Sequence, residues 1–524
     1  MTVKRPQGGI DPVVLVLPLA AIGPFLPALR NGLVWDDKVY VAGNPLFALG
    51  WRAAIAQAFR TITIGNWHPL TLLSLCFDHA LGGPEPLTYH LVNLLLHAAN
   101  ALLVQRTIVR VTGDRVAAFG AALLWAVHPL RVESVAWISE RKDLLYAMFF
   151  LLALLAYFRH ASASGRIGGS YAAALGCFVA SCLSKAMGVS LVPVLVLADW
   201  LLGRRGSART LAEKVPFAIV GLVIGCVAIG AQRSADAIPL AQSGGLPARI
   251  AYACYAVVFY GVKTIAPFGL SGLYRYPVGP EGGLLPSVWA SVVLTLALAA
   301  ACVAAARRSR LVGFGIGTAV ATIALVLQIL PVGGVVAADR YTYLPGVGLS
   351  IVVAAGLARA RAYARRVAIV AVVPVAIAFS AATWARCGAW RDEVVFWSSV
   401  LARDPGAAPA HQNLGVALDE RGDAAGAIAH LDAAVRIGPA VPEYRFDRGL
   451  AMGDAGRWDE ALADLTEAIR LKPDFAAAYM NRGLALEQMG RAAEGAPDVR
   501  RAAELGFPVD PAVSARFDSA GAAR

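Results

Sequence analysis

Long hydrophobic runs recur along most of the chain and constrain its fold more than any other feature. A helix needs about 20 apolar residues to cross roughly 30 Å of hydrocarbon. Hydrophobic residues make up 58% of the 524-residue chain and charged residues 16%, compared with about 25% charged residues in soluble domains. We therefore predict an all-α polytopic membrane protein. We expect twelve runs, near positions 12–29, 90–110, 116–130, 143–158, 170–184, 187–202, 215–231, 249–268, 286–306, 311–334, 342–360 and 366–384.

The basic residues lie in short loops between these runs. Short cytoplasmic loops of membrane proteins are rich in Lys and Arg, so this pattern indicates topology and argues against a nucleic-acid site. Lys4 and Arg5 place the N-terminus in the cytoplasm, and the C-terminal residues are then expected on the opposite side. The clusters are Arg106, Arg110 and Arg115; Arg204, Arg205 and Arg209; Arg307, Arg308 and Arg310; and Arg359, Arg361, Arg365 and Arg366.

One run must not cross the membrane if the charge rule is to hold. If all twelve runs crossed, the arginine clusters after position 306 would change sides. Run 249–268 contains several tyrosines, Lys263 and Pro267, which suit a re-entrant or interfacial segment buried against protein. We therefore expect 249–268 not to span the membrane.

The composition changes after Trp384, and a period of 34 residues begins. This period is typical of tetratricopeptide repeats (TPR), in which pairs of helices stack into an α-solenoid. We predict a half-repeat connector at 386–407, three repeats within 408–509 and a tail at 510–524. The positions in phase include Gly415, Gly449 and Gly483, and Pro439 and Pro473.

The predicted solenoid suits a protein or peptide partner, because its concave groove can hold an extended chain or a helix. An alternative is that these helices bind nothing. The candidate groove residues are Asn413, Arg445, Arg448, Asn481 and Arg482.

Adjacent carboxylates open the first predicted external loop, residues 31–89. Asp36 and Asp37 repel each other, which can raise the pKa of one of them. Either could serve as a general base, or both could help to hold a divalent cation. The alternative is a solvated turn. His68 lies in the same loop and is a candidate supporting residue.

Four polar residues, His90, Asn93, His97 and Asn100, follow helical spacing in the second hydrophobic run. They share one helix face, where exposure to lipid would be costly. This face either lines a wet cavity or forms hydrogen bonds between helices. We assign His90 and Asn93 as supporting residues of the site.

The second predicted external loop, residues 131–143, is rich in charge. Arg131, Arg141 and Lys142 could bind a phosphate, and Glu133 and Asp143 could orient these cations or the acceptor. Further cations on this side are Lys185 and Arg340, the latter following Asp339. Such a group suits sugar transfer from a lipid phosphate, because cations can stabilise the departing phosphate.

These motifs resemble the transmembrane and tetratricopeptide-repeat O-mannosyltransferases and their bacterial relatives, within the wider GT-C glycosyltransferase superfamily. The resemblance covers nearly the whole chain. Its carriers are Val34-Trp35-Asp36-Asp37, Asn66-Trp67-His68-Pro69-Leu70, His128-Pro129 with Glu133, Glu140-Arg141-Lys142-Asp143-Leu144, Ser184-Lys185, and Asp339-Arg340-Tyr341-Thr342-Tyr343-Leu344-Pro345.

The resemblance implies a GT-C-like domain at 1–385, a polyprenyl- or dolichyl-phosphate sugar donor, and inversion at the anomeric carbon. It implies that Asp36 and Asp37 form the catalytic acidic motif. The family commonly has an acidic residue after Ser-Lys, whereas this chain has Ala186. Mannose is implied by animal relatives, and bacterial relatives could use another sugar.

We thus expect a glycosyltransferase of a bacterial inner membrane, with its active-site loops and repeats on the non-cytoplasmic side. The acceptor would be a hydroxyl of a protein or another molecule. One alternative is an inactive membrane-anchored TPR scaffold. Another is a transporter of lipid-linked sugar, which would more often show charges at the midplane and internal symmetry.

Overall fold

The computed structural model describes residues 13–163, 167–204, 206–234, 245–279, 283–329 and 334–522. These residues form helices and three isolated bridges, with no β-strand among them. The chain divides into two compact units, Met1–Arg391 and Asp392–Arg524. The all-α fold class is therefore confirmed, and each unit is described by itself below.

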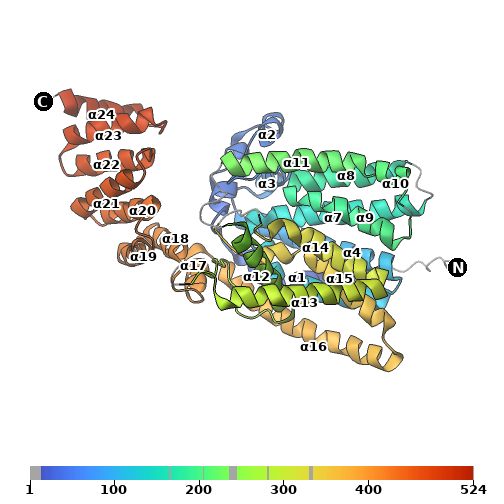
Figure 1. The fold of residues 1–524 in the computed structure, drawn as a ribbon. Coiled ribbons are helices and arrows are strands. Elements are labelled where there is room, and N and C mark those ends of the chain that lie inside the picture. The colour runs from blue at the N-terminus through green and yellow to red at the C-terminus, as the bar shows by residue number, and fades with distance from the viewer. Residues whose placement is uncertain are drawn as a thin grey trace. The chain divides into compact units, whose positions relative to one another are not determined.

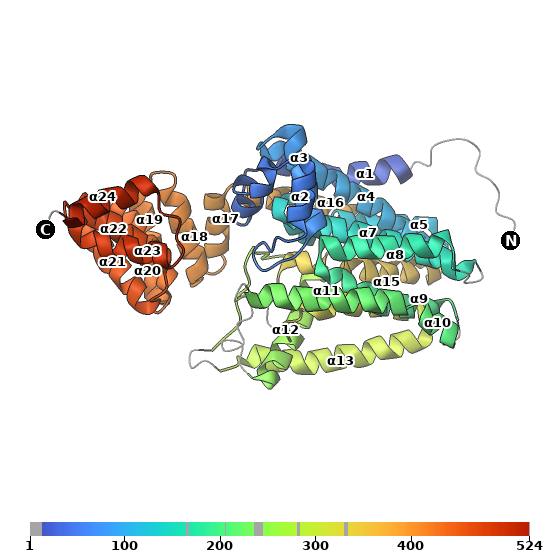
Figure 2. The ribbon, with the colours of Figure 1, turned by 90° about the horizontal axis from the view of Figure 1, so that it is seen from above.

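The long helices of the first unit run roughly alongside one another (Figures 1 and 2). The helices are α1 Val13–Ile22, α2 Trp51–Ala58, α3 Pro69–Gly82, α4 Pro86–Thr112, α5 Arg115–Ala126, α6 Val132–Ala136, α7 Arg141–Ser162, α8 Gly169–Ser184, α9 Leu191–Leu201, α10 Ala208–Ala212, α11 Val215–Ser234, α12 Leu246–Ile265, α13 Pro286–Arg308, α14 Arg310–Ile323, α15 Pro345–Arg359 and α16 Ala362–Cys387. The short helical turns are η1 Gly23–Arg30, η2 Lys38–Ala42, η3 Pro45–Ala48, η4 Pro129–Arg131, η5 Ile138–Glu140, η6 Ala186–Ser190, η7 Ala324–Val326, η8 Asp339–Thr342 and η9 Gly388–Trp390.

Each of the twelve hydrophobic runs contains helical structure among its described residues, whereas position 12 of the first run and positions 330–333 of the tenth lie outside the described residues. By length and composition, five helices of the described residues could cross a membrane, or six if one bent pair counts as a span. Several other runs are apolar helices of 10–17 residues. Run 249–268 forms α12, which is not one of the five, and its failure to span remains a prediction. The five are Pro86–Thr112, Ile138–Ser162, Ala208–Ser234, Pro286–Arg308 and Ala362–Trp390.

The turn between α4 and α5 shows how local sequence sets the helix boundaries. Gly113 ends α4 in a left-handed conformation, with φ of 74°, which glycine adopts without steric cost. Asp114 then caps α5 by accepting hydrogen bonds from the N–H groups of Val116 and Ala117. The chain therefore reverses within a few residues, and α4 packs against α5.

An ionic network lies near the C-terminal end of α7, away from the predicted catalytic loops. Tyr157 donates a hydrogen bond of 2.7 Å to Asp199 on α9. Arg204 binds Asp199 at 2.8 Å and Glu213 at 2.9 Å. Lys214 pairs with Asp199 and contacts the Tyr157 hydroxyl. This network ties the end of α7 to α9 and to the start of α11.

The second unit contains stacked helix pairs that repeat every 34 residues. A Cβ atom on Gly415 would lie 2.6 Å from Leu431 Cγ, and one on Gly483 would lie 2.8 Å from Val499 Cγ2. Glycine is therefore required where the two helices of a repeat cross. The helices are α17 Glu393–Leu401, α18 Ala408–Asp419, α19 Ala424–Ile437, α20 Pro442–Asp454, α21 Trp458–Leu471, α22 Ala476–Gln488, α23 Ala492–Glu504 and α24 Pro511–Ala522.

Candidate active site

The two aspartates of the acidic motif have different environments. Asp37 is buried, and its carboxylate accepts hydrogen bonds from the N–H of Val34 at 3.1 Å and the N–H of Ser139 at 2.8 Å. The Ser139 hydroxyl donates a further bond. Asp37 thus fastens the acidic turn to η5. Burial raises its pKa to about 7, against the lowering effect of these hydrogen bonds.

Asp36 is only partly buried. Among the residues that the structure describes, no hydrogen bond or ion pair engages its carboxylate. Burial raises the pKa of Asp36, while the charges of Lys142 and Arg340 lower it and that of Glu140 raises it again. Asp36 is therefore a carboxylate beside cations that is still able to accept a proton.

Three tryptophans support the acidic turn. Trp35 stacks on Trp137, with ring centroids 5.1 Å apart and an interplanar angle of 11°. Trp137 in turn stacks on Trp390, with centroids 5.2 Å apart. Trp35 has a φ of 57°, which is uncommon for a residue other than glycine. Such strain persists only where surrounding contacts hold it, and the stack supplies such contacts.

Glu140 is the centre of a group of three cations. Its Oε1 atom lies 3.1 Å from Lys142 Nζ and 3.3 Å from Arg340 Nε, and its Oε2 atom lies 3.4 Å from Lys185 Nζ. The Glu140 side chain is 2% exposed. One buried carboxylate therefore gathers cations from three separate parts of the sequence, two of which also act on Asp36.

Two further carboxylates, for which an orienting role is a prediction from the sequence, flank these cations. Glu133 accepts a hydrogen bond of 3.0 Å from the backbone N–H of Arg340 and pairs with its guanidinium. Asp143 lies 2.6 Å from Lys185 Nζ and accepts a bond from the Ser134 hydroxyl. Ala186 follows Lys185 where the family commonly has an acidic residue. Lys185 nevertheless belongs to the three cations around Glu140.

Arg141 lies apart from the three cations and has its own partners. Its Nη2 atom is 2.6 Å from Asp78 and 2.8 Å from the Tyr89 carbonyl, and its side chain is fully buried. It also donates to Asn93, whose amide reaches the carbonyl of Val135 at 3.2 Å. Arg141 therefore joins α7, α3 and α4, and is not directed at the Glu140 group.

The remaining polar residues on α4 form hydrogen bonds between segments. His90 Nε2 lies 3.2 Å from the Asn31 carbonyl, and His97 Nδ1 lies 2.9 Å from the Tyr343 hydroxyl. Asn100 donates to the Leu144 carbonyl at 2.9 Å. These contacts correspond to the interhelical alternative for this helix face.

His68 is buried immediately before α3. Its ring centroid lies 5.4 Å from that of Tyr40, and its Nε2 atom has no hydrogen-bond partner among the described residues. Burial lowers the pKa of His68 to about 3, with a further lowering by Lys142. The His68 ring is therefore neutral at ordinary pH. It lies close enough to Lys142, one of the three cations around Glu140, to be affected by its charge.

Asp339 and Arg340 are neighbours in sequence but face different partners. Asp339 accepts a hydrogen bond of 2.6 Å from Arg386 on α16 and one of 2.9 Å from the Tyr274 hydroxyl. Arg340 is directed instead to Glu133 and Glu140. Asp339 therefore fixes η8 while Arg340 contributes to the cation group.

The acidic pair has limited capacity to hold a metal ion. The described part of the chain contains no group of three or more His, Cys, Asp or Glu side chains that could hold one. Both oxygens of Asp37 are already used by Val34 and Ser139.

Sequence reasoning assigned no role to Glu140, Trp137 or Arg386. Glu140 lies within the charged loop 131–143, and its charge is the signal in the sequence that indicates a role for it. Trp137 and Arg386 act through Trp35 and Asp339, which are distant in sequence. No local pattern indicates such contacts.

All five candidate groove residues of the repeats are engaged within their own unit. Arg448 binds Asp464, and Arg482, 34 residues later, binds Asp498, each at 2.7 Å. Asn413 donates to a carbonyl of its own helix at 2.7 Å. The remaining two candidates behave alike: Arg445 pairs with Asp464, and Asn481 donates to the Ala477 carbonyl.

Comparison with protein families identifies the repeats. A family described as TPR repeat matches residues 453–490, and one described as tetratricopeptide repeat matches residues 397–442. Among solved structures, the crystal structure of MamA is 26% identical and covers 21% of this chain and 66% of its own. Its TM-score of 0.21 is too low to support an argument about fold.

Similar sequences extend into the membrane unit. Protein O-mannosyl-transferase TMTC2 of Mus musculus is 40% identical over 137 residues, which are 26% of this chain and 16% of the mouse protein. Protein O-mannosyl-transferase TMTC4 of Homo sapiens is 25% identical over 503 residues, covering 79% of this chain and 65% of the human protein. The chain thus spans less than two thirds of either relative. These homologues confirm the resemblance to O-mannosyltransferases with TPR repeats.

Proposed function

We propose that this chain is a membrane glycosyltransferase that moves a sugar from a polyprenyl-phosphate donor to a hydroxyl group of a protein acceptor. One observation carries the proposal: Asp36, a carboxylate engaged by no described group, lies under the influence of cations that Glu140 gathers. The names of the homologues favour mannose as the sugar and protein as the acceptor.

In the proposed reaction, the Asp36 carboxylate takes the proton of the acceptor hydroxyl as the acceptor oxygen bonds to the anomeric carbon. The bond from that carbon to the phosphate oxygen breaks on the opposite face, so the configuration inverts. Polyprenyl phosphate leaves with the electron pair. Asp36 then returns its proton to solvent. Fixing the donor and acceptor together converts an encounter of two molecules into a step within one complex.

The cations have a separate part in this step. Negative charge accumulates on the phosphate as it leaves, and charges already fixed in position stabilise it without reorganisation. We assign this role to Lys142, Lys185 and Arg340. Glu140 positions them.

The other candidate residues support these groups. Asp37 holds the acidic turn, while Glu133 and Asp143 orient Arg340 and Lys185. Arg141, predicted from the sequence to bind phosphate, is assigned instead to the framework, because its donors are used by other partners. We assign the same structural role, that of holding the loops and helices around the site in place, to His68, His90, Asn93 and Asp339.

We propose a bacterial inner membrane as the location, with the catalytic loops and the repeats on the non-cytoplasmic side. The arginine clusters support this orientation, because short loops rich in arginine remain in the cytoplasm. In this arrangement the donor binds the membrane unit, residues 1–385, and the repeats at 408–509 bind the acceptor protein.

The proposal is tested with the purified full-length protein, a panel of polyprenyl-phosphate sugars and an acceptor peptide rich in serine and threonine. We expect one donor, mannose first, to be consumed by the parent protein and not by Asp36→Asn. Consumption of no donor would favour the inactive scaffold. Movement of donor across sealed vesicles without transfer would favour a transporter.

A further inference from the structure

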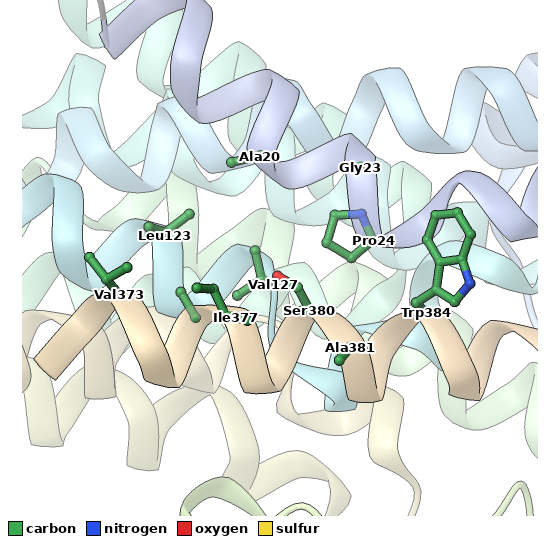
Figure 3. A pocket seen from close by; sticks show the side chains of 11 residues that line it. Ala20, Gly23, Pro24, Leu123, Val127, Val373, Ile377, Ser380, Ala381 and Trp384 are labelled. Carbon is green, nitrogen blue, oxygen red and sulfur yellow. The ribbon is translucent and has the colours of Figure 1, made fainter.

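An apolar groove runs along α16, where it faces α1, η1 and α5. Its volume is about 610 Å³, within the range of roughly 300–1,000 Å³ that is usual for small-molecule sites. The lining is small and apolar, with Ala20, Leu123, Ala376 and Ala381 among its residues. Figure 3 shows the side chains of Ile377 and Trp384 on α16 and Pro24 opposite them.

A second hollow of about 460 Å³ has one lining residue in common with the groove and differs from it in character. Trp384 lines both hollows. The second is also lined by Arg30, Asn31 and Arg391, and Arg30 is exposed. Taken together, the two hollows have an apolar lining along α16 in the first and two arginines, Arg30 and Arg391, in the second.

The dimensions match one half of a bilayer. The groove follows α16 from Val373 to Trp384, a rise of about 16 Å at 1.5 Å per residue. One leaflet of hydrocarbon is about 15 Å thick. Trp384 is 53% exposed, and tryptophan is enriched at the level of lipid headgroups. The arginines therefore lie where a headgroup phosphate would lie.

We infer that this groove binds an anionic phospholipid of the bilayer, with an acyl chain along α16 and its phosphate between Arg30 and Arg391. α16 is one of the helices that could span the membrane, and only 17% of its apolar window is buried within the protein. Lipid therefore covers this face in a bilayer. The two guanidinium groups add selectivity for a negative headgroup.

The occupant is not the sugar donor. The cations assigned to the donor phosphate are Lys142, Lys185 and Arg340, and none of them lines either hollow. This site consequently remains even if the chain transfers no sugar. It would fix η1, the segment that leads directly into the acidic turn.

The test uses the full-length protein in phosphatidylcholine nanodiscs that contain phosphatidylglycerol with a diazirine in its acyl chain. After illumination, labelled peptides are quantified by mass spectrometry. We expect labels on α16 between Val373 and Trp384. Ala381→Phe, which fills the groove, should lower this labelling at least fivefold. Ala382→Phe, which changes an exposed neighbour outside the groove, should not.

Charge selectivity is tested with the same probe. Arg30→Gln should lower labelling by phosphatidylglycerol about fivefold, the effect expected for one basic residue near a charged lipid surface. Its control is Arg52→Gln, which removes an exposed charge outside both hollows and should have no such effect. Equal labelling by a phosphatidylcholine probe, or no change in Ala381→Phe, would overturn the inference. So would displacement of the probe by polyprenyl phosphate at lower concentration than by phosphatidylglycerol.

Discussion

Replacing Asp36 and Asp37 separately by asparagine should have different consequences, although the two residues are adjacent: the first change should lower turnover and the second should lower stability. Asparagine keeps the size of the side chain and removes its basicity. Asp36→Asn should therefore slow sugar transfer by about 10²–10⁴-fold, the usual effect of losing a general base. This corresponds to about 2.7–5.4 kcal/mol in the activation barrier. Its stability should change little, because no described group bonds to the Asp36 carboxylate.

Asp37→Asn should chiefly reduce stability. The carboxylate of Asp37 accepts bonds from the N–H groups of Val34 and Ser139 on its two oxygens. An amide has one oxygen and one NH2 group, so one buried N–H would face a donor. A buried polar group left without a partner costs about 1–3 kcal/mol.

Two measurements separate these effects. Transfer is followed with polyprenyl-phosphate mannose under saturating donor, and unfolding is followed by tryptophan fluorescence on heating. We expect Asp36→Asn to bind donor and unfold near the parental temperature while its turnover falls. Parental turnover in Asp36→Asn would refute the assignment of the base. A stable Asp37→Asn protein with the same loss of turnover would refute the division of roles.

Four further outcomes follow from the structure and the charge pattern. Arg340→Lys should raise KM for the donor, because a lysine cannot bridge both carboxylates that the guanidinium contacts; unchanged donor kinetics would remove Arg340 from the site. Burial raises the pKa of Asp37 from 3.8 to about 7. The contribution of Asp37 to the stability of the folded protein is therefore complete below pH 3.8 and is lost as the pH rises through about 7. The unfolding temperature of the parent should thus fall across this interval more than that of Asp37→Asn, and equal slopes would contradict this. Gly346→Ala should destabilise the protein by about 1–3 kcal/mol, since its Cβ would lie 2.7 Å from Arg131 Nη2; parental heat stability would count against it. A reporter fused after Arg524 should be found outside the cytoplasm, and a cytoplasmic signal would invert the proposed orientation.

Much of the helical fold could be predicted, because hydrophobic length and the 34-residue period are local properties of the sequence. Each expected membrane run contains helical structure among its described residues, and the in-phase glycines lie at helix crossings. Helix α3 was not expected. At 14 residues it is shorter than a typical span and falls in a segment that we predicted to be an external loop.

The candidate site could be predicted as a region but not as a set of roles. Asp36 and Asp37 are equivalent in sequence, and only the contact between Asp37 and Ser139 distinguishes them. Arg141 and Lys142 are likewise adjacent. Successive residues on a helix point about 100° apart, so Lys142 reaches Glu140 whereas Arg141 reaches Asp78. Such differences depend on tertiary contacts that no local pattern contains.

The two ionic networks at the ends of α7 fix the register of this helix. Fourteen residues separate Asp143 from Tyr157, which is close to four complete turns and about 21 Å along the axis. Both anchors therefore lie on nearly the same side of α7. An inserted residue would rotate one anchor by about 100° relative to the other and leave buried charges without partners. Evolution can consequently lengthen the loops of this protein far more readily than α7, and adaptation to a thicker bilayer would have to come from tilting the helix or from other segments.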